Sequence, residues 1–256
     1  MKIFSQFWLA AAVVGASSAL PSQALAAPPT LTAKPAAASL SLPAGQTDLG
    51  NGAIAYRPAN LPAGKRPLVV LLHGNNQKAD ELIGPFRAEA DRRGLILLAP
   101  KSSGRTWDLM LSAEKFRDRP PRNGEKPEFG QDIARIDAAL NSLFGKAPVD
   151  PAKIVLAGFS DGGSYALSLG LPNPRLFSGL IAFAPGSLLA PPQVSLSQRI
   201  AIASGRADRV IPIRVVRDLA APLAAAKLKV QFEEFGGAHK IDERALAKAL
   251  DFTLAP

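Results

Sequence analysis

Short apolar segments alternate with amphipathic helical segments along most of the chain, and this alternation constrains the fold more than any other feature. The apolar segments include PLVVLLHG, LILLAP and KIVLAGFS, which have no polar face and are typical of strands covered on both sides. The stretch FGQDIARIDAALNSLFGK repeats its apolar residues at helical spacing. Because parallel strands need crossover connections, we expect an α/β protein whose mainly parallel sheet is flanked by helices on both faces.

The other segments between Gly52 and the C-terminus fit the same scheme. The stretch KADELIGPFRAEADRRG predicts a helix that Gly84-Pro85 interrupts and Gly94 ends. Residues 101–128 have no apolar period and are predicted to form a long polar loop, and loops of this length are often functional. The remaining strand candidates are AIAYRP, FSGLIAFAPG, RIAIASG and LKVQFEEFGG, and the remaining helix candidates are DGGSYALSLGL, RVVRDLAAPLAAAK and DERALAKALDFTL.

The first residues differ in composition from this domain. Residues 1–26 combine a lysine at position 2, a short apolar run and an Ala24-Leu25-Ala26 cleavage pattern, which predicts a secretory signal peptide. The apolar run is too short for a membrane anchor, so we expect a periplasmic or secreted protein with no stable membrane insertion after cleavage. Residues 27–45 are rich in Pro, Ala and Ser and predict a flexible leader, followed by a single domain over 46–256.

Composition excludes several kinds of chemistry. The chain has no cysteine, which removes disulfides and thiol catalysis, and only two histidines, which argues against a histidine-rich metal site. The formal net charge of +9 raises the question of nucleic acid, but the basic residues are scattered among acidic ones and carry no recognition motif. We therefore expect a solvated basic surface and no nucleic-acid partner.

One serine stands in a pattern that points to catalysis. Residues 158–162 read Gly-Phe-Ser-Asp-Gly and match G-x-S-x-G, between a strand candidate and a helix candidate. At such a corner, glycines let strand and helix approach closely while the serine adopts a strained backbone conformation that exposes its hydroxyl. The alternative is a purely structural turn. The position favours Ser160 as a nucleophile.

A serine hydroxyl needs a base to remove its proton, and the two histidines are the candidates. His239 lies in the loop after the last strand candidate, where it would reach the same edge of the sheet as Ser160. His73 ends an early strand and is better explained as a histidine that fixes a loop. In chains whose nucleophilic serine lies at such a strand-to-helix corner, called a nucleophile elbow, the base follows the serine.

The base needs a carboxylate partner that orients it. Asp208 follows another buried strand and has the required position, although a turn or an ion pair with Arg206 or Arg209 would also explain it. Asp161 is fixed in the first turn of the elbow helix, where its charge suits the helix dipole, and Asp242 is expected to cap the last helix. The predicted catalytic set is therefore completed by Asp208.

The tetrahedral intermediate of acyl transfer needs hydrogen-bond donors for its oxyanion. The backbone N–H of Asp161, directly after the nucleophile, is one candidate. The second is the backbone N–H of Asn75, in the polar loop after LLHG, with Gly74 allowing a close approach. Trp107 and Asp108 in the long loop have two open interpretations, as substrate contacts or as a core anchor with a capping aspartate.

These motifs together resemble the phospholipase/carboxylesterase branch of the α/β-hydrolases. The segments that carry the resemblance lie between about residues 65 and 255, and they are PLVVLLHGNNQ, IVLAGFSDGGSYALSLGL, LIAFAPG, GRADRVIP and GGAHKID. The chain is similar as well to acyl-protein thioesterases, dienelactone hydrolases and polyhydroxybutyrate-depolymerase-like esterases. The resemblance implies the α/β-hydrolase fold, ester or thioester hydrolysis without a cofactor or metal, and a Ser160, Asp208 and His239 triad.

Two departures from the resemblance lie beside the predicted acyl site. Asp161 stands where related thioesterases commonly have glutamine, and the loop after His73-Gly74 lacks their usual glycine-aspartate pattern. Both affect substrate choice more than reaction type. We expect a serine hydrolase acting on a small-molecule or lipid-like carboxylic ester. The alternatives are a thioesterase or serine peptidase of the same fold, or a non-catalytic binding protein on this scaffold.

Overall fold

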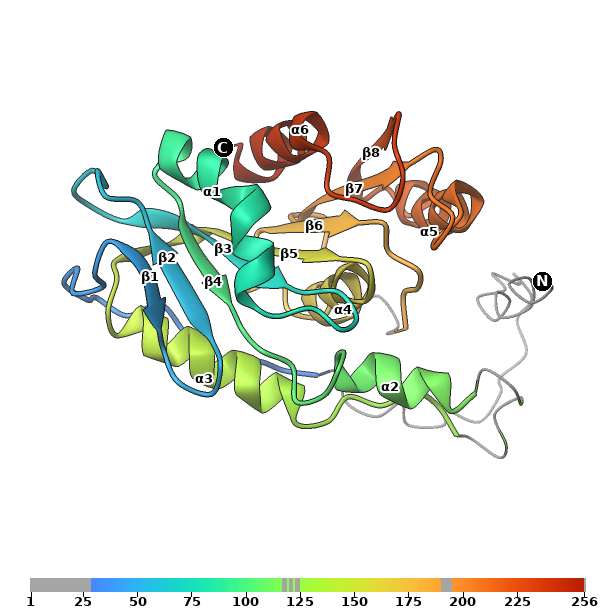
Figure 1. The fold of residues 1–256 in the computed structure, drawn as a ribbon, viewed down its shortest axis with the longest axis horizontal. Coiled ribbons are helices and arrows are strands. Elements are labelled where there is room, and N and C mark those ends of the chain that lie inside the picture. Colours follow the sequence, from blue (N-terminus) through green and yellow to red (C-terminus); the bar gives the residue numbers. More distant parts are fainter. Residues whose placement is uncertain (1–28, 117–118, 120–121, 123–124, 190–194, 256) are drawn as a thin grey trace.

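The computed structural model describes residues 29–116, 119, 122, 125–189 and 195–255, which form one α/β layer structure (Figure 1). The predicted signal peptide, residues 1–26, lies outside the described residues. The strands are β1 (Gly45–Asp48), β2 (Ile54–Arg57), β3 (Arg66–Leu72), β4 (Ile96–Ala99), β5 (Val149–Phe159), β6 (Gly179–Phe183), β7 (Arg199–Gly205) and β8 (Lys229–Phe235). The helices are η1 (Asp80–Leu82, a 3₁₀ turn), α1 (Ile83–Arg93), α2 (Asp108–Glu114), α3 (Asp132–Phe144), α4 (Asp161–Gly170), α5 (Ile213–Ala225) and α6 (Glu243–Leu254).

The strands form one sheet of eight in the order β1-β2-β4-β3-β5-β6-β7-β8. The pairs from β4 through β8 are parallel, and the pairs that β2 makes with β1 and β4 are antiparallel. The predicted mainly parallel sheet is confirmed. Since parallel strands end at a common edge, the loops after β3, β5, β7 and β8 all emerge on one side of the sheet.

Two hydrophobic cores lie on opposite faces of the sheet, because successive strand residues point to opposite sides. In β3, Leu68, Val70 and Leu72 belong to the core shared with α3, α4 and α5, while Val69 and Leu71 belong to the core shared with α1 and α6. This division confirms helices on both faces. It also explains the continuous apolar strand runs, since neither face of these strands meets water.

The structure corrects two expectations about local elements. The predicted break at Gly84-Pro85 is wrong, because α1 begins at Ile83 and keeps both residues in its first turn, where proline's missing N–H has no intrahelical partner to lose. Gly94 does end this helix in the left-handed conformation, with φ 64°. The predicted loop over 101–128 contains α2, a helix of 7 residues that the sequence pattern missed.

Residues 29–44 contain no helix and no strand, yet they pack against the domain. Leu31 and Leu42 are buried in the core on the α3 side of the sheet. The backbone N–H of Leu31 donates to the side chain of Asn173, at 3.1 Å, just beyond α4. The segment predicted to be a flexible leader therefore lies along the domain over these residues.

Candidate active site

Ser160 occupies a strained position at the junction of β5 and α4. Its backbone has φ 56° and ψ −120°, a conformation that costs a non-glycine residue about 1–3 kcal/mol. The N–H of Ser160 donates to the carbonyl of Phe183 in β6, at 2.8 Å, which ties the strained residue to the neighbouring strand. Strain held in this way at a half-buried serine is a feature of nucleophile positions, and it agrees with the predicted elbow.

The two glycines of the motif, Gly158 and Gly162, stand where the surrounding backbone leaves no room for a Cβ atom. A Cβ on Gly158 would lie 2.1 Å from the carbonyl oxygen of Gly162. A Cβ on Gly162 would lie 2.0 Å from the carbonyl oxygen of Leu72, at the end of β3. Any side chain at either position would push the helix away from the sheet. The spacing G-x-S-x-G thus follows from the close crossing of α4 over β3 and β5.

Asp208 and His239 lie in direct contact, as the sequence predicted. Nδ1 of His239 is 2.7 Å from Oδ2 of Asp208. The other carboxylate oxygen accepts from the backbone N–H groups of Val210 and Ile211, each at 2.8 Å. Since Asp208 is 6% exposed and held at both oxygens, it fixes the imidazole orientation and its tautomer, leaving Nε2 as the nitrogen able to accept a proton.

The ladder between β7 and β8 brings these two residues together. Gly205 and Phe235 are the last paired residues of the two strands. A Cβ on Gly205 would lie 2.3 Å from the carbonyl oxygen of Gly237, so the two following loops approach as closely as backbone allows. Asp208 and His239 come three and four residues beyond this pair. A parallel register with short loops is therefore enough to form their contact.

The imidazole of His239 lies against the nucleophile elbow. Its ring centroid is 4.6 Å from that of Phe159, the residue directly before Ser160. The His239 side chain is 19% exposed, so the ring is partly accessible from outside the protein. The structure thus brings together, at one edge of the sheet, the three residues that the sequence singled out.

His73 has a different environment, which supports the structural interpretation. It is fully buried, its Nε2 accepts from the N–H of Ser102 at 3.2 Å, and its Nδ1 lies 2.8 Å from the carbonyl of Gly74. Because Ser102 supplies a proton, Nε2 is the acceptor and Nδ1–H donates to Gly74. Burial lowers the pKa of this imidazole.

The two predicted oxyanion donors lie on separate elements. Asp161 is the first residue of α4, and the first N–H groups of a helix have no acceptor within the helix. Asn75 is exposed in the loop after β3, and its side-chain oxygen accepts from the guanidinium of Arg105 at 2.9 Å. The N–H of Gly74 donates to the side chain of Gln77, at 2.7 Å, so this group is already engaged.

The side chains of Trp107 and Asp108 are core and cap residues. Trp107 is fully buried, and its Nε1–H donates to the carbonyl of His73 at 2.8 Å. Asp108 accepts from the N–H of Asp132 at 2.7 Å, and Asp132 accepts in return from the N–H of Asp108 at 2.8 Å. The two aspartates thus cap the first turns of α2 and α3 reciprocally, which favours the interpretation of Trp107 and Asp108 as anchors.

Asp242 caps α6, as predicted, accepting from the N–H groups of Arg244 and Ala245 at 3.1 Å each.

Sequence reasoning missed two residues near the elbow. Thr106 is buried and donates its hydroxyl to Oδ2 of Asp161 at 2.8 Å, and Arg105 reaches Asn75. Neither has a periodic or motif signal, since each is recognised only by a partner distant in the chain.

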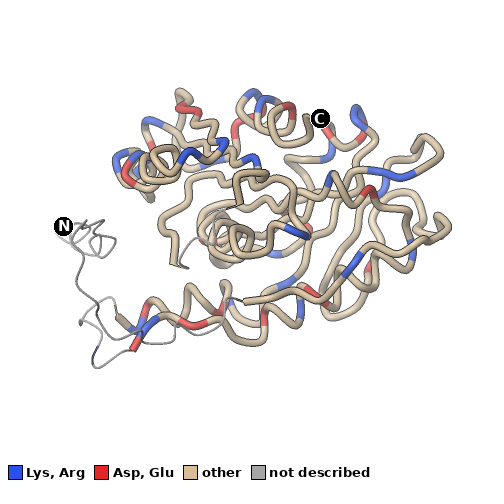
Figure 2. Tube along the Cα trace, turned by 180° about the vertical axis from the view of Figure 1, so that it is seen from behind, with Lys and Arg blue, Asp and Glu red and all other residues tan. Residues whose placement is uncertain are grey.

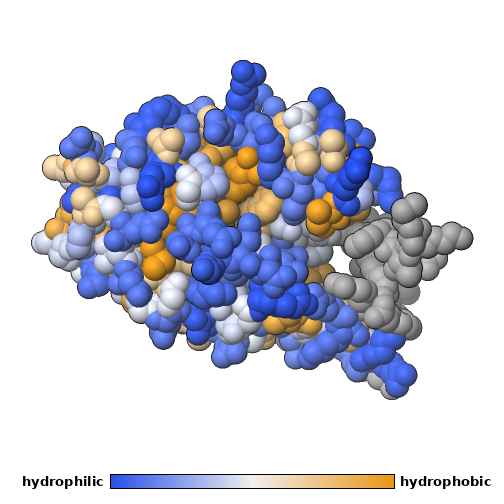
Figure 3. Space-filling view, viewed as in Figure 1, coloured by the Kyte–Doolittle hydropathy of each residue, from blue (hydrophilic) through white to orange (hydrophobic). Residues whose placement is uncertain are grey.

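Apolar side chains border the same edge of the sheet. A Cβ on Gly186, after β6, would touch Ile211 at 3.1 Å, so the loops after β6 and β7 are in contact. Leu188 and Leu189 are half-buried and pack on the core, and Val210 is 53% exposed. Figure 3 shows apolar residues at the middle of one face, with hydrophilic residues around them.

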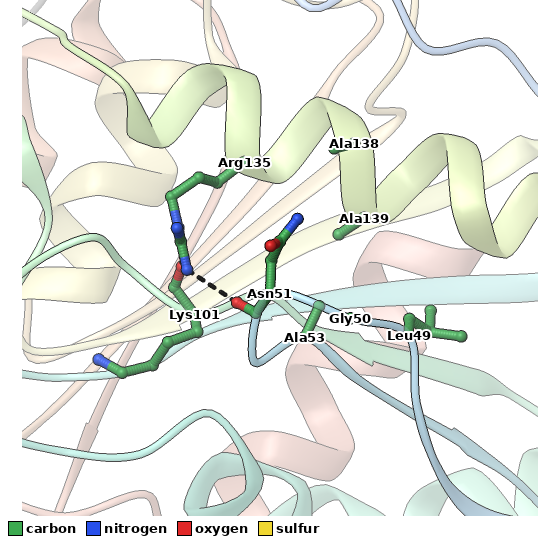
Figure 4. Close-up of a pocket in the computed structure, with 8 residues that line it drawn as sticks. All are labelled: Leu49, Gly50, Asn51, Ala53, Lys101, Arg135, Ala138 and Ala139. Carbon is green, nitrogen blue, oxygen red and sulfur yellow. Dashed lines mark hydrogen bonds between the residues drawn. The ribbon is translucent and has the colours of Figure 1, made fainter.

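A separate small cavity lies away from these residues, between the β1–β2 turn and α3 (Figure 4). Its volume is about 30 Å³, far below the 300–1,000 Å³ or so of a typical small-molecule site. Two cations line it, but the guanidinium of Arg135 donates to the carbonyls of Lys101 and Asn51 at 2.9 and 2.7 Å. The cavity is part of the packing between loop and helix.

Charge on the described surface is mixed. Figure 2 shows lysines and arginines interspersed with acidic residues along the trace. Within the described ranges, no group of three or more His, Asp or Glu side chains is arranged to hold a metal ion. In that same part of the chain, no helix has the length and apolar character needed to cross a membrane.

Comparison with known proteins agrees with this architecture. The solved structure of esterase PE8 superimposes with a TM-score of 0.57 at 21% identity, over 77% of this chain and 95% of that one. The fold is therefore that of the α/β-hydrolases. Residues 62–255 match the phospholipase/carboxylesterase family, and the chain belongs to that family.

Two curated relatives match about half of the residues of this chain. NocK of Nocardia uniformis subsp. tsuyamanensis, whose name assigns it provisionally as an esterase, is 36% identical over 134 residues, 52% of this chain. The poly(3-hydroxybutyrate) depolymerase of Ralstonia pickettii is 30% identical over 141 residues, 49% of this chain. The matched regions span only 36% and 27% of the lengths of these relatives.

Proposed function

We propose that this chain is a serine hydrolase that cleaves carboxylic esters through Ser160, His239 and Asp208. The observation that carries the proposal is the 2.7 Å contact between Nδ1 of His239 and Oδ2 of Asp208, with the same imidazole packed against the residue before the strained serine. Such a constellation prepares a base whose orientation is fixed and whose charge, once formed, is balanced. Membership of the phospholipase/carboxylesterase family supports the same reaction class.

In the proposed acylation step, Oγ of Ser160 attacks the ester carbonyl carbon while Nε2 of His239 takes the hydroxyl proton. The Asp208 carboxylate stabilises the resulting imidazolium. The backbone N–H groups of Asn75 and Asp161 donate to the oxyanion of the tetrahedral intermediate. Collapse of this intermediate breaks the bond to the alcohol oxygen, which leaves with the proton from His239.

Deacylation repeats these steps with water in place of the serine. Nε2 of His239 removes a proton from water, whose oxygen attacks the acyl-enzyme carbonyl. The second tetrahedral intermediate collapses, Ser160 regains its proton from His239, and the carboxylic acid leaves. No cofactor or metal enters either step. Every proton and electron pair is exchanged between the substrate, water, Ser160 and His239, and Asp208 stays ionised throughout.

The proposed substrate is an ester with an apolar acyl or alcohol group. The apolar side chains around Ile211 and Leu188 support this class, because burying apolar surface there would stabilise the bound substrate by about 25 cal/mol per Å². The name of the Nocardia relative, which contains the word esterase, agrees with an ester substrate. We further propose export to the periplasm or beyond, which N-terminal sequencing of the mature protein would test by locating cleavage after Ala26.

A fluorophosphonate probe and p-nitrophenyl acetate provide the direct test. The wild type should be labelled once per chain and should hydrolyse the ester, and Ser160→Ala should abolish both. The exposed Ser197, at the opposite end of β7, supplies a matched control, because Ser197→Ala should be labelled as the wild type is. Retained turnover in Ser160→Ala would remove the assignment.

The same assay separates the alternatives. Faster turnover of a p-nitrophenyl thioester analogue or of a peptide anilide than of the ester would favour a thioesterase or a peptidase. Absence of stoichiometric labelling in the folded wild type would favour a binding protein on this scaffold. Labelling together with preferred ester turnover supports the proposal.

A further inference from the structure

The two proposed oxyanion donors belong to different elements, so something must set their separation. Asn75 lies in the loop after β3, and Asp161 begins the helix after β5. A tetrahedral intermediate needs donors within about 2.7–3.1 Å of one oxygen position. The segment Ser102–Trp107, which we call the brace, lies between β4 and α2. It makes hydrogen bonds to the loop after β3 and to the first residue of α4.

Toward the loop after β3, the brace bonds first to His73. The N–H of Ser102 donates to Nε2 of His73 at 3.2 Å, and Nε1–H of Trp107 donates to the carbonyl of the same residue at 2.8 Å. The rings of His73 and Trp107 also pack at a centroid distance of 4.9 Å. Both ends of the brace are therefore fixed to His73. This is the first residue of the loop after β3, residues 73–79, which we call the oxyanion loop.

The middle of the brace bonds to the tip of the oxyanion loop. The carbonyl of Arg105 accepts from the N–H of Asn76 at 2.8 Å, and the Arg105 guanidinium donates to Oδ1 of Asn75 at 2.9 Å. Glu114 in α2 forms an ion pair with the same guanidinium. This arrangement fixes Asn75 through both its side chain and its following peptide.

Toward the nucleophile elbow, the brace bonds through one side chain. Oγ1 of Thr106 donates to Oδ2 of Asp161 at 2.8 Å. Thr106 is fully buried, and Asp161 is half-buried at the first position of α4, so this bond lies beneath the surface of the site. Hydrogen bonds to a carboxylate are stronger than those between neutral groups, which suits a fixed link.

We propose that the bond between Thr106 and Asp161 couples the oxyanion loop to the nucleophile elbow, which makes both residues positioning residues for the oxyanion donors. The inference rests on the proposed ester hydrolysis. The proposal explains why Asp161 places a carboxylate beside a site that must stabilise the negative charge of the oxyanion: this carboxylate accepts the Thr106 hydroxyl. The positive end of the α4 dipole and the Thr106 hydroxyl both stabilise that carboxylate where it stands.

Substitutions of Thr106 test the link without changing the charge beside the oxyanion. Thr106→Val removes the hydroxyl and keeps the shape, and Thr106→Ser keeps the hydroxyl. Loss of one whole oxyanion donor lowers kcat by about 10²–10³, so misplacing a donor should lower kcat by about 10-fold to 10² in Thr106→Val. KM should change little, and Thr106→Ser should restore most of kcat.

Two further measurements exclude a merely structural effect. A trifluoromethyl ketone forms a tetrahedral adduct with an oxyanion, so its Ki should rise in Thr106→Val in proportion to the loss in kcat/KM. Thr253 is the matched control, because it is also buried and donates its hydroxyl within α6, to Ala249 at 2.7 Å. Thr253→Val should lose stability and keep kcat.

The outcomes separate this inference from the proposed function. If Ser160→Ala keeps turnover, the proposed function fails and the inference fails with it. If Ser160→Ala is inactive while Thr106→Val keeps wild-type kcat and Ki, only the positioning role is overturned. Equal losses in Thr106→Ser and Thr106→Val would overturn it too. Where Thr106→Val does not fold, Thr106→Ala supplies the hydroxyl-free variant and must show the same fall in kcat and rise in Ki.

Discussion

The two histidines of the chain, His73 and His239, have the same side chain in opposite environments. His73 is fully buried, and both of its ring nitrogens bond to backbone groups. His239 has a 19% exposed side chain, and its Nδ1 bonds to the carboxylate of Asp208. The imidazole of His73 thus bonds only to backbone groups, while that of His239 has a carboxylate partner and is partly exposed.

This difference separates structural from catalytic use of an imidazole. A catalytic base must gain and lose a proton during each cycle, so the accepting nitrogen must meet the substrate or nucleophile and the charged form must be stabilised. Protonation of His73 at Nε2 would break its bond to Ser102 inside the protein. Protonation of His239 would strengthen its bond to Asp208. The environment, more than the residue type, decides which histidine can catalyse.

The largest effect is expected on activity, when His239 is substituted. His239→Gln removes the proposed base, and kcat should fall by a factor on the order of 10⁶, as expected for loss of the base in a triad. Its free energy of unfolding should stay close to that of the wild type, because the glutamine amide N–H can replace Nδ1–H as the donor to the buried Asp208 carboxylate. Steady-state kinetics with p-nitrophenyl acetate and urea unfolding would measure both quantities. A His73→Leu variant with the same loss per folded molecule would contradict the division of roles.

A smaller loss is expected when only the orientation of the base is changed. Asp208→Asn keeps an oxygen for Val210 and Ile211 but presents a neutral partner to Nδ1 of His239, which favours the wrong tautomer. We expect kcat to fall about 10⁴-fold. Asp242→Asn is the matched control, because that aspartate caps α6 and should affect stability alone. Wild-type kcat in Asp208→Asn would show that His239 does not depend on this carboxylate.

The third prediction concerns stability on the His73 side of the comparison. His73→Leu leaves the N–H of Ser102 without its acceptor in a buried position, so the free energy of unfolding should fall by about 1–3 kcal/mol. Urea unfolding of His73→Leu and of His239→Gln would measure the contrast. An unchanged midpoint in His73→Leu would mean that the bond contributes nothing net.

Much of the fold could be predicted because its parallel strands are apolar on both faces. Segments such as β3 and β5 carry that signal in the sequence alone. The edge strand β1 reads GQTD and has no apolar residue, so nothing in the sequence marked it. The start of α2 depends on the distant carboxylate of Asp132, which binds the N–H of Asp108 and lies 24 residues further along the chain. Such capping is invisible to a local pattern.

The site divides in the same way. The positions of Ser160, Asp208 and His239 at one edge of the sheet could be predicted because each follows a recognisable strand, and parallel strands end at one edge. The bond between Thr106 and Asp161 joins residues 55 positions apart, one of them in a loop without any period. No spacing rule connects them, so only the folded chain reveals that the carboxylate beside the nucleophile has a hydroxyl partner.

The smallest expected effect is a pH dependence of stability that belongs to His73. Burial lowers its pKa in the folded chain, so below about pH 6.5, the ordinary histidine pKa, the unfolded chain binds a proton that the folded chain does not. The free energy of unfolding should therefore fall as the pH falls, by at most about 1.4 kcal/mol per pH unit from this group. Urea unfolding between about pH 7 and 5 should give a shallower slope for His73→Leu than for the wild type. His239→Gln keeps His73 and should retain this contribution, so parallel curves for His73→Leu and the wild type would contradict the assignment.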